Sequence, residues 1–484
     1  MRRARRSIAL LCLSVVPLTA ITSLPASAED PASARVLAAA DHITVGKDRR
    51  GFVYVDPGVW VASVDGALEL LATRADYDSP VTLTQTDAET GAVVRTLPAD
   101  LLDGWFGLRD FLHVAVRDAD GRLVMRQRYT FCPNSYGRSR LSDDGPLNGR
   151  YPQFCGGNPF TLGNVYGIDH GWAVPAFDEY GYGNTLAFRA DERRYRVAVW
   201  IDGAWAEALG VAPQDQRVEV DVRVVRGHDH HGGEPPIPAE SAAAPFVAVP
   251  ETTTPPAETL PDLIALPAWG MQTRRAGGRD LLAFNATEWN AGPGTMLVEG
   301  FRQANEPLMD AYQYFLRDGV AIGRSPAGGL EFHAEHGHWH FLQFTEYSLI
   351  DATTGDVQLS GKQSWCLVNT DAIDLTRPNA AWAGFGGDVF TQCGSRGAIW
   401  IREVLDVGWG DTYGQYIPGQ AFDITNVPNG RYIVRVEVNP DDLLLESSMT
   451  NNVTDRLIRI RGSRGARTVI VEPWHGIEDD CLYC

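Results

Sequence analysis

Four of the chain's eleven histidines lie close together, in the stretch His333-Ala-Glu-His336-Gly-His338-Trp-His340. His336, His338 and His340 recur at every second position, and side chains at that spacing share one face of a β-strand. Three imidazoles on one face can converge on a single cation, and an imidazole-rich site without thiolates suits Cu(II), Zn or Fe. The apolar residues between them would point the other way, into a core. We therefore interpret this stretch as a metal site rather than a solvated histidine tract.

Lysine is scarce in this chain. Lys and Arg together number 42, yet Lys47 and Lys362 are the only lysines. Codon preference explains the general shortage, but it does not explain why the later lysine follows the histidine cluster, in Gly361-Lys362-Gln-Ser-Trp-Cys366. Arginine stays protonated, whereas a lysine amine can lose its proton and form covalent adducts. We therefore expect Lys362 to perform chemistry that arginine cannot.

The N-terminus predicts export. Residues 1–28 contain a basic start, an apolar run over 8–21 and the small-residue sequence Pro25-Ala-Ser-Ala28, which together are typical of a secretory signal peptide. No other run approaches the roughly eighteen apolar residues of a membrane span. The net charge of −19 disfavours nucleic acid and would attract polyamines or lysine-rich proteins. We therefore expect a secreted, extracellular protein.

Cysteine usage agrees with an oxidising compartment. Seven cysteines become six once Cys12 leaves with the signal peptide, and an even number in an exported chain indicates disulfides. Pairing nearest neighbours gives three bridges: Cys132–Cys155, Cys366–Cys393 and Cys481–Cys484. Six cysteines allow fifteen connectivities, so other pairings stay open, including one that clamps the C-terminal tail elsewhere.

The periodicity predicts a mainly β protein without a helix of convincing length in its first half. Segments rich in β-branched and aromatic residues, several of them alternating with period two, predict strands. They are residues 42–45, 51–55, 111–116, 194–201, 218–224 and 431–438, with a terminal strand at 457–461. We expect a β-sandwich-like catalytic domain with long loops and a separate N-terminal β-rich domain.

Composition shifts predict the domain boundaries. The signal peptide precedes a β-rich domain of unknown role, a Pro- and His-rich linker, the catalytic domain, and a tail with a Cys-x-x-Cys pattern. The predicted segments are 1–28, 29–225, 226–258, 259–464 and 465–484.

Ordered motifs over residues 261–461 resemble the catalytic domain of the lysyl oxidase family. The histidine cluster is followed by Gly361-Lys362-x-Ser-x-Cys366-Leu and then by Asp411-Thr-Tyr413. Further along come Asp423-Ile-Thr-x-Val-Pro-x-Gly430-x-Tyr432, Val438-Asn-Pro440 and Glu446-Ser-x-x-Thr-Asn451-Asn452. The ordered set is more specific than any one motif, and the N-terminal half lies outside it.

The resemblance implies a Cu(II) enzyme with a self-made lysine tyrosylquinone. By motif position, His336, His338 and His340 are the copper ligands. The same positions assign the quinone cross-link to Lys362 and Tyr413. From the sequence alone, Tyr347 and Tyr416 are rivals of Tyr413, and the family pattern selects among them.

The implied reaction is oxidative deamination of a primary amine by O₂, giving an aldehyde, hydrogen peroxide and ammonia. Peptidyl lysine, polyamines and small primary amines all remain open as substrates. A general base must remove the substrate's α-proton, and His333, Glu346 and Asp411 are the candidates. Glu346 stands where animal members of the family have a histidine, a departure that leaves the base unassigned.

The resemblance also implies a calcium site. Its oxygen ligands would come from Asp262 and the carbonyl of Leu263 on one side, and from Glu446, Asn451 and Asn452 on the other. Oxygen ligands are those that Ca²⁺ prefers. Ser448 replaces an acidic residue of the family pattern, which would weaken the site.

Two other functions fit part of the pattern. One is a non-catalytic copper-binding protein, exported or attached to a cell wall. The other is a different mononuclear metal oxidase, of the cupin or multicopper type. The single histidine cluster argues against a multicopper enzyme, and the spacing of later residues argues against a cupin. The oligomeric state is not predicted by the sequence.

Overall fold

The computed structural model describes most of the chain between residues 31 and 479. The described ranges are 31–135, 137–141, 145–146, 148–177, 186–226, 249–302, 307–333, 336, 338–382, 393–394, 398, 400–477 and 479. The expected signal peptide, most of the expected linker, and Cys481 and Cys484 lie outside them. Strands make up 54% of the structure and helices 4%, which confirms the mainly β class.

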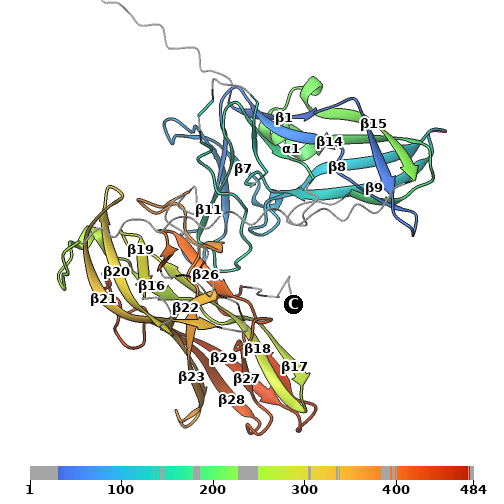
Figure 1. Ribbon diagram of the computed structural model, residues 1–484. Helices are drawn as coiled ribbons and strands as arrows, with labels where there is room; N and C mark the ends of the chain where they lie inside the picture. Colours follow the sequence, from blue (N-terminus) through green and yellow to red (C-terminus); the bar gives the residue numbers. More distant parts are fainter. Residues whose placement is uncertain are drawn as a thin grey trace, which may run out of the picture.

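The N-terminal half, residues 31–226, consists of antiparallel sheets, except that β2 pairs with β15 in parallel (Figure 1). The strands of its first sheet follow the order β1 (Ser33–Ala38), β4 (Val59–Val64), β12 (Trp172–Pro175) and β10 (Ser139–Arg140). Those of the second sheet follow the order β11 (Gly163–Ile168), β5 (Leu68–Thr73), β6 (Thr82–Thr86) and β7 (Val93–Leu97). The strands of the third sheet follow the order β2 (His42–Lys47), β15 (Arg217–Arg226), β14 (Arg194–Ile201), β8 (Leu108–Asp118) and β9 (Leu123–Phe131). In a fourth, two-stranded sheet, β13 (Leu186–Arg189) pairs with β3 (Phe52–Val55).

The C-terminal half, residues 249–479, contains two further sheets. The smaller has the order β16 (Leu263–Ala265), β18 (Arg279–Asn290), β26 (Trp409–Tyr413), β24 (Asp371–Ala372), with β17 (Trp269–Ala276) and β27 (Ala421–Asp423) also paired to β18. The larger has the order β25 (Trp400–Leu405), β19 (Met296–Phe301), β20 (Leu308–Arg317), β21 (Val320–His333), β22 (His338–Asp351), β28 (Gly430–Val438), β29 (Val453–Arg461), β30 (Thr468–Val471), with β23 (Val357–Trp365) paired to β22.

Helices are short. The α-helix α1 spans Gly203–Leu209, and the 3₁₀ turns η1, η2 and η3 span Ala99–Leu101, Pro213–Asp215 and Ala257–Thr259. Asp202 caps α1 by accepting a hydrogen bond from the Ala204 N–H, and Gly210 ends it in the left-handed conformation that glycine tolerates. Among the described residues, no helix has the length and apolarity that would let it cross a membrane.

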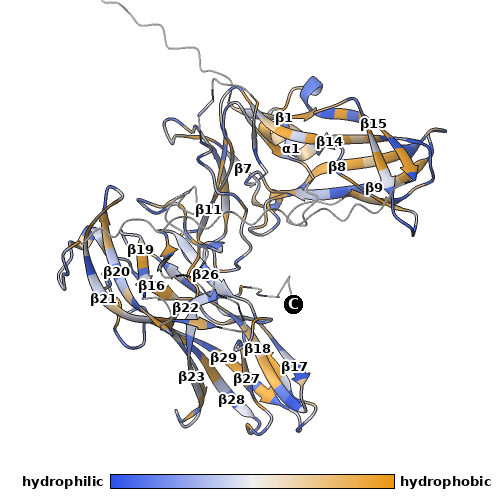
Figure 2. Cartoon of the chain, viewed as in Figure 1, coloured by the Kyte–Doolittle hydropathy of each residue, from blue (hydrophilic) through white to orange (hydrophobic). Residues whose placement is uncertain are grey.

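The two sheets of the C-terminal half enclose one hydrophobic core, as expected of a sandwich. Phe284 on β18 contacts Tyr347 on β22 edge to face, with ring centroids 5.1 Å apart. Burial alternates along β28, so every second side chain enters the core. β14 and β18 are coloured as largely hydrophobic strands in Figure 2, and β18 is buried along most of its length.

Most predicted strands are confirmed, with one correction at the C-terminus. Residues 457–461 belong to β29, but this strand is not terminal, because β30 pairs with it afterwards. The tail expected from residue 465 therefore begins with a strand of the sheet. Two of the three nearest-neighbour disulfides, Cys132–Cys155 and Cys366–Cys393, are confirmed.

Buried acids lie between the two sheets of the C-terminal half. Glu288 on β18 is the direct cross-strand partner of Asp411 on β26, so both side chains project from the same face. Both are fully buried, and neither carboxyl oxygen of Glu288 has a well-formed hydrogen bond among the described residues. Burial raises the pKa of Glu288 well above its ordinary value, and the nearby Asp411 raises it further.

The raised pKa gives a stability prediction for Glu288→Gln. At neutral pH the folded chain keeps a proton on Glu288 that the unfolded chain has lost, because an exposed glutamate has a pKa of about 4.3. The wild-type free energy of unfolding therefore falls as pH rises above that value. Glutamine has no such dependence. We expect the melting temperature of the variant, relative to wild type, to rise steadily between pH 5 and pH 8, and a pH-independent difference would contradict the assignment.

Candidate metal centre and cofactor residues

The histidine cluster occupies the hairpin between β21 and β22. His333 ends β21 and is the cross-strand partner of His338, which begins β22. The expectation of three ligands on one strand face is therefore wrong for His336, which lies in the turn and donates its N–H to the carbonyl of His333 at 3.1 Å. His338 and His340 share a strand, as predicted. The apolar neighbour Trp339 is buried in the core.

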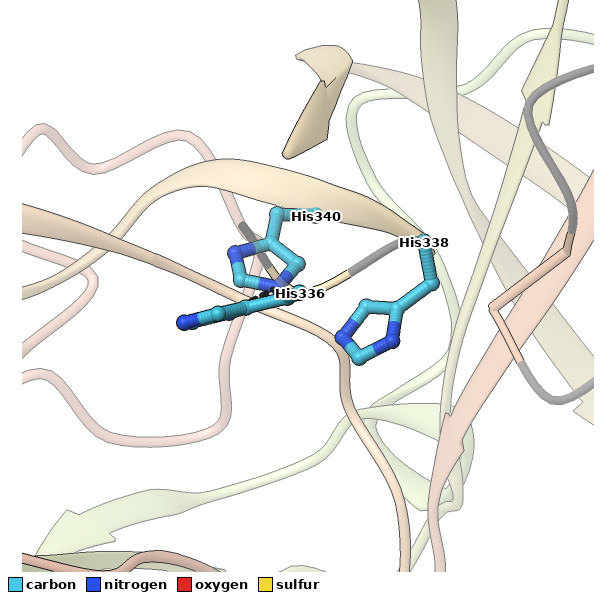
Figure 3. Close-up of side chains that lie close together, drawn as sticks. All are labelled: His336, His338 and His340. Atoms are coloured by element: carbon cyan, nitrogen blue, oxygen red, sulfur yellow. Dashed lines mark hydrogen bonds between the residues drawn. The ribbon is translucent and has the colours of Figure 1, made fainter. Parts of the chain in front are cut away.

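The turn brings His336 back toward the other two imidazoles (Figure 3). One nitrogen from each of His336, His338 and His340 can be chosen so that all three lie within 4.8 Å of one another. His336 Nδ1 lies 3.0 Å from His340 Nε2. Nitrogens bound about 2.1 Å from a metal ion are within about 4 Å of each other. The donor set therefore fits a mononuclear metal ion with nitrogen ligands.

Burial favours the neutral form of His338 and His340, the form in which an imidazole binds a metal. Desolvation, together with the three neighbouring histidines, lowers the pKa of His340 to about 3. Desolvation also lowers the pKa of His338. The hydroxyl of Ser364 lies 3.3 Å from His340 Nδ1, which leaves Nε2 facing the other histidines.

His333 belongs to the same cluster of rings. Its ring centroid lies 4.3 Å from that of His336, and it stacks on His340 at 4.9 Å with an angle of 11° between the planes. Its Nδ1 is buried without a hydrogen-bond partner among the described residues. His333 is therefore adjacent to the candidate ligands and is not one of the three nitrogens that cluster most closely.

Tyr413, at the end of β26, lies beside the histidines. Its ring meets that of His340 edge to face, with centroids 6.1 Å apart, and it stacks on Trp365 at 4.1 Å. Its phenolic oxygen accepts a hydrogen bond of 2.7 Å from the N–H of Cys366. Burial raises the pKa of the Tyr413 phenol above its ordinary value, and the nearby Asp411 adds to the increase.

The two rival tyrosines have different environments. Tyr347 is fully buried, and its hydroxyl accepts a hydrogen bond of 2.9 Å from the side chain of Gln420. Tyr416 is 70% exposed. The ring contact with His340 therefore distinguishes Tyr413 from these two rivals, which the sequence alone did not.

Lys362 lies on β23, and the structure describes its backbone but not its side chain. It is two positions before Ser364, whose hydroxyl contacts His340, and shortly before Trp365 and Cys366, which contact Tyr413. The strand that carries the lysine therefore leads directly to the candidate tyrosine.

The remaining candidate bases occupy different places. Glu346 is the cross-strand partner of Lys362 and accepts a hydrogen bond from the hydroxyl of Ser360. Asp411 faces Glu288, and burial raises its pKa well above its ordinary value. Glu403, a third buried acid, accepts a hydrogen bond from the Leu367 N–H. Glu288 and Glu403 belong to no motif, and their neighbourhood with Tyr413 depends on strand pairing that the sequence did not reveal.

The disulfide between Cys366 and Cys393 links the cluster to the tyrosine. The carbonyl of Cys393 accepts a hydrogen bond of 2.9 Å from the N–H of Trp339, between two candidate ligands. Its partner Cys366 holds the Tyr413 phenol. Because both sulfurs are in the bridge, neither is a thiolate ligand for copper, which argues against a multicopper-type site here.

The candidate calcium ligands also come together, across β16 and the loop before β29. Glu446 accepts hydrogen bonds from the Leu263 N–H at 2.6 Å and from the side chain of Asn452 at 2.9 Å. Asp262 accepts one from Asn451 at 3.0 Å. The side-chain oxygens of both asparagines are buried without partners among the described residues. Asn439 was missed as a member of this group, although its side chain also donates to Glu446 at 2.7 Å.

Burial, together with the nearby Asp262, raises the pKa of Glu446 to about 7. Two carboxyl groups close together and unpartnered amide oxygens are the donors that a hard cation takes. The residues present therefore fit a calcium ion.

Comparison with known proteins gives a consistent result. The sequence model of the lysyl oxidase family matches residues 324–469, which contain the histidine cluster, Lys362 and Tyr413. Lysyl oxidase homolog 1 of Homo sapiens is 37% identical over 125 residues, 25% of this chain and 19% of that protein. Protein-lysine 6-oxidase of Homo sapiens is 35% identical over 139 residues, 28% of this chain and 30% of that protein.

Another relative matches a longer stretch of this chain. Lysyl oxidase homolog 3 of Homo sapiens is 30% identical over 206 residues, 40% of this chain and 24% of that protein. The chain thus spans less than a third of the length of each of these three relatives. The segment that matches the family model contains the histidine hairpin, β23 and β26, which form the site. Residues 324–469, which make up much of the C-terminal half, match the lysyl oxidase family.

Proposed function

We propose that this chain is a copper- and quinone-dependent amine oxidase that converts primary amines to aldehydes and releases hydrogen peroxide and ammonia. One observation carries the proposal: the ring of Tyr413 lies beside that of His340, with centroids 6.1 Å apart, and its oxygen accepts a hydrogen bond from the N–H of Cys366. Cys366 directly follows the strand that carries Lys362. The candidate metal site and an oxidisable phenol are thus neighbours, and the strand that carries the lysine ends beside the phenol. The family match and the names of the relatives support the same class of reaction.

His336, His338 and His340 would hold the copper. When bound, copper would couple O₂ to oxidation of the Tyr413 ring, and the lysine tyrosylquinone would supply the electron sink for amine oxidation. The chain's own residues prepare this chemistry. Burial favours the neutral form of His338 and His340, and the Cys366 N–H and the Trp365 ring fix the orientation of the phenol.

We assign removal of the substrate's α-proton to His333. Its ring packs against two candidate copper ligands, and its Nδ1 is without a partner among the described residues. Asp411 is a poor acceptor, because burial holds its carboxyl protonated beside Glu288. Glu346 is occupied by the hydroxyl of Ser360.

The proposed substrate is a cationic primary amine, either peptidyl lysine or a smaller amine. The net charge of −19 would attract such substrates and repel nucleic acid. We also propose that the protein is secreted, since residues 1–28 have the pattern of a signal peptide and the chain contains disulfides.

We further propose that calcium has a structural role. Asp262 and Leu263 lie at the start of the C-terminal half, and Glu446, Asn451 and Asn452 lie between β28 and β29. An ion bound by all five would join the start of β16 to the loop between β28 and β29 of the larger sheet, across a long sequence separation. Ser448, in place of an acid, reduces the negative charge of the site.

The first test is Lys362→Arg, matched by Lys47→Arg. We expect Lys362→Arg to bind copper normally but to form no quinone, because a guanidinium stays protonated and cannot add to the oxidised ring. Lys47 forms an ion pair with Glu192 far along the chain from the motif, and its replacement should leave quinone formation intact. Copper content, quinone absorbance and amine-dependent peroxide release measure the outcome. Peroxide release by Lys362→Arg at the wild-type rate would refute the cofactor assignment.

The second test is His338→Ala, matched by the exposed His42→Ala. Removing one of three nitrogen ligands should abolish stoichiometric copper binding and, with it, quinone formation. His42→Ala should retain both. Metal analysis of the purified proteins gives the copper content directly, and normal copper in His338→Ala would contradict the ligand assignment.

The third test is calcium addition with and without Glu446→Gln. A ligand that binds only the folded state at a concentration one hundred times its Kd stabilises that state by about 2.7 kcal/mol. We expect calcium to raise the melting temperature of the wild type and a chelator to lower it. Glu446→Gln, which cannot supply a carboxylate, should show little response. Equal responses of the two proteins would place calcium elsewhere.

A further inference from the structure

The N-terminal half pairs directly with the C-terminal half through backbone hydrogen bonds. The N–H groups of Leu162 and Gly163 donate to the carbonyl of Ile373 at 2.6 and 3.1 Å, and the Leu375 N–H donates to the carbonyl of Gly163 at 2.9 Å. Gly163 is the first residue of β11, which lies where the two halves meet (Figure 1). The sheet of β11 is thereby joined to the chain segment that follows β24.

Side chains from the same loop reach further inside. Asn158 Nδ2 donates to the hydroxyl of Thr287 on β18 at 2.9 Å, and the Thr161 hydroxyl donates to the carbonyl of Ala372 at 2.7 Å. The Asn158 side-chain oxygen accepts the N–H of Phe160, which fixes the direction of its amide. Asn158, Thr161 and Thr287 are fully buried, so these hydrogen bonds are shielded from water.

Apolar packing makes this contact part of the core. Phe160 is fully buried in one cluster with Trp269, Trp289 and Ile373 of the C-terminal half. Val165 and Tyr151 belong to the main core of the C-terminal half. Interfaces between domains of one chain are usually more polar and permit relative motion. This one is built like a protein interior and holds the two halves together.

The loop holds the two segments that must meet at the cofactor. Thr287 shares a hydrogen bond of 2.7 Å with Thr412, the residue before Tyr413. The other segment runs from Cys366 to Ala372. The Cys366 N–H donates a hydrogen bond to the Tyr413 oxygen, and the Thr370 hydroxyl accepts one from the Thr412 N–H at 2.7 Å. That segment is the direct continuation of the strand that carries Lys362.

We propose that the N-terminal half is a permanent clamp that aligns Tyr413 with the lysine-bearing segment, with Asn158 and Thr161 as positioning residues. The proposal rests on the proposed function, because the alignment matters only if the lysine is to join the tyrosine. Reacting groups must be held about 3–3.5 Å apart, and a displacement of about 1 Å can cost a hundredfold in rate. The clamp reaches the Tyr413 strand through the hydroxyls of Thr287 and Thr412, and it reaches the lysine-bearing segment through the carbonyl of Ala372.

The test uses the full-length chain with Asn158→Ala combined with Thr161→Val, which together remove both side-chain hydrogen bonds. The Thr161→Ser variant keeps its hydroxyl and is the conservative control. Asp78→Asn is the interface control, since Asp78 pairs with His475 across the same two halves at an exposed position. Copper content, the time course of quinone formation, and amide hydrogen exchange of residues 409–413 are measured for each protein.

We expect the double variant to bind copper normally and to form quinone at least about tenfold more slowly, with faster exchange over residues 409–413. Thr161→Val alone, which keeps the packing volume, should show a smaller change in the same direction. Both controls should match the wild type. Quinone formation at the wild-type rate in the double variant, or unchanged exchange, would overturn the proposal.

The two proposals fail in different ways. A wild-type chain that binds copper but makes no quinone would refute the proposed function. The exchange measurement needs neither copper nor oxygen, so it would still decide whether the loop at 158–163 holds β26.

Discussion

The antiparallel register of β18 and β26 decides which side chains meet at the centre of this molecule. Ala286 opposes Tyr413 and Glu288 opposes Asp411, so these four lie on one face. Thr287 and Thr412 lie on the other face and share a hydrogen bond, and Thr287 also accepts one from Asn158 of the N-terminal half. A shift of one residue would exchange the two faces, because side chains alternate along a strand. It would take the phenol from His340 and direct it toward the N-terminal half.

The same register explains the unusual buried acids. Burial raises the pKa of the Glu288 and Asp411 carboxyls well above their ordinary values, and Asp411 adds to the increase at Glu288. Burial lowers the pKa of His338 and His340 in the same way. Desolvation thus favours the uncharged form of each of these four groups at the centre of the molecule.

Sequence periodicity predicted the mainly β class and located a minority of the strands, such as β14, β15 and β28, because alternation of apolar residues follows directly from half-buried sheets. It misplaced His336, since the same alternation continues through a hairpin turn. Glu288 was not predicted, because Thr287-Glu288-Trp289 resembles any other strand interior and its significance comes from the strand opposite. The role of Asn158 was equally invisible, as it depends on contact across a long sequence separation. The side chain of Lys362 remains a prediction from motif position.

The bridge between Cys366 and Cys393 has a consequence for how such a chain matures. Cys366 donates a backbone hydrogen bond to the Tyr413 oxygen, and Cys393 accepts one from the N–H of Trp339, between His338 and His340. Thiol oxidation therefore fastens the imidazole hairpin to the residue that holds the phenol. A chain folded where thiols stay reduced would lack this tether, so the compartment of folding would decide whether the hairpin and the phenol's anchor are covalently joined.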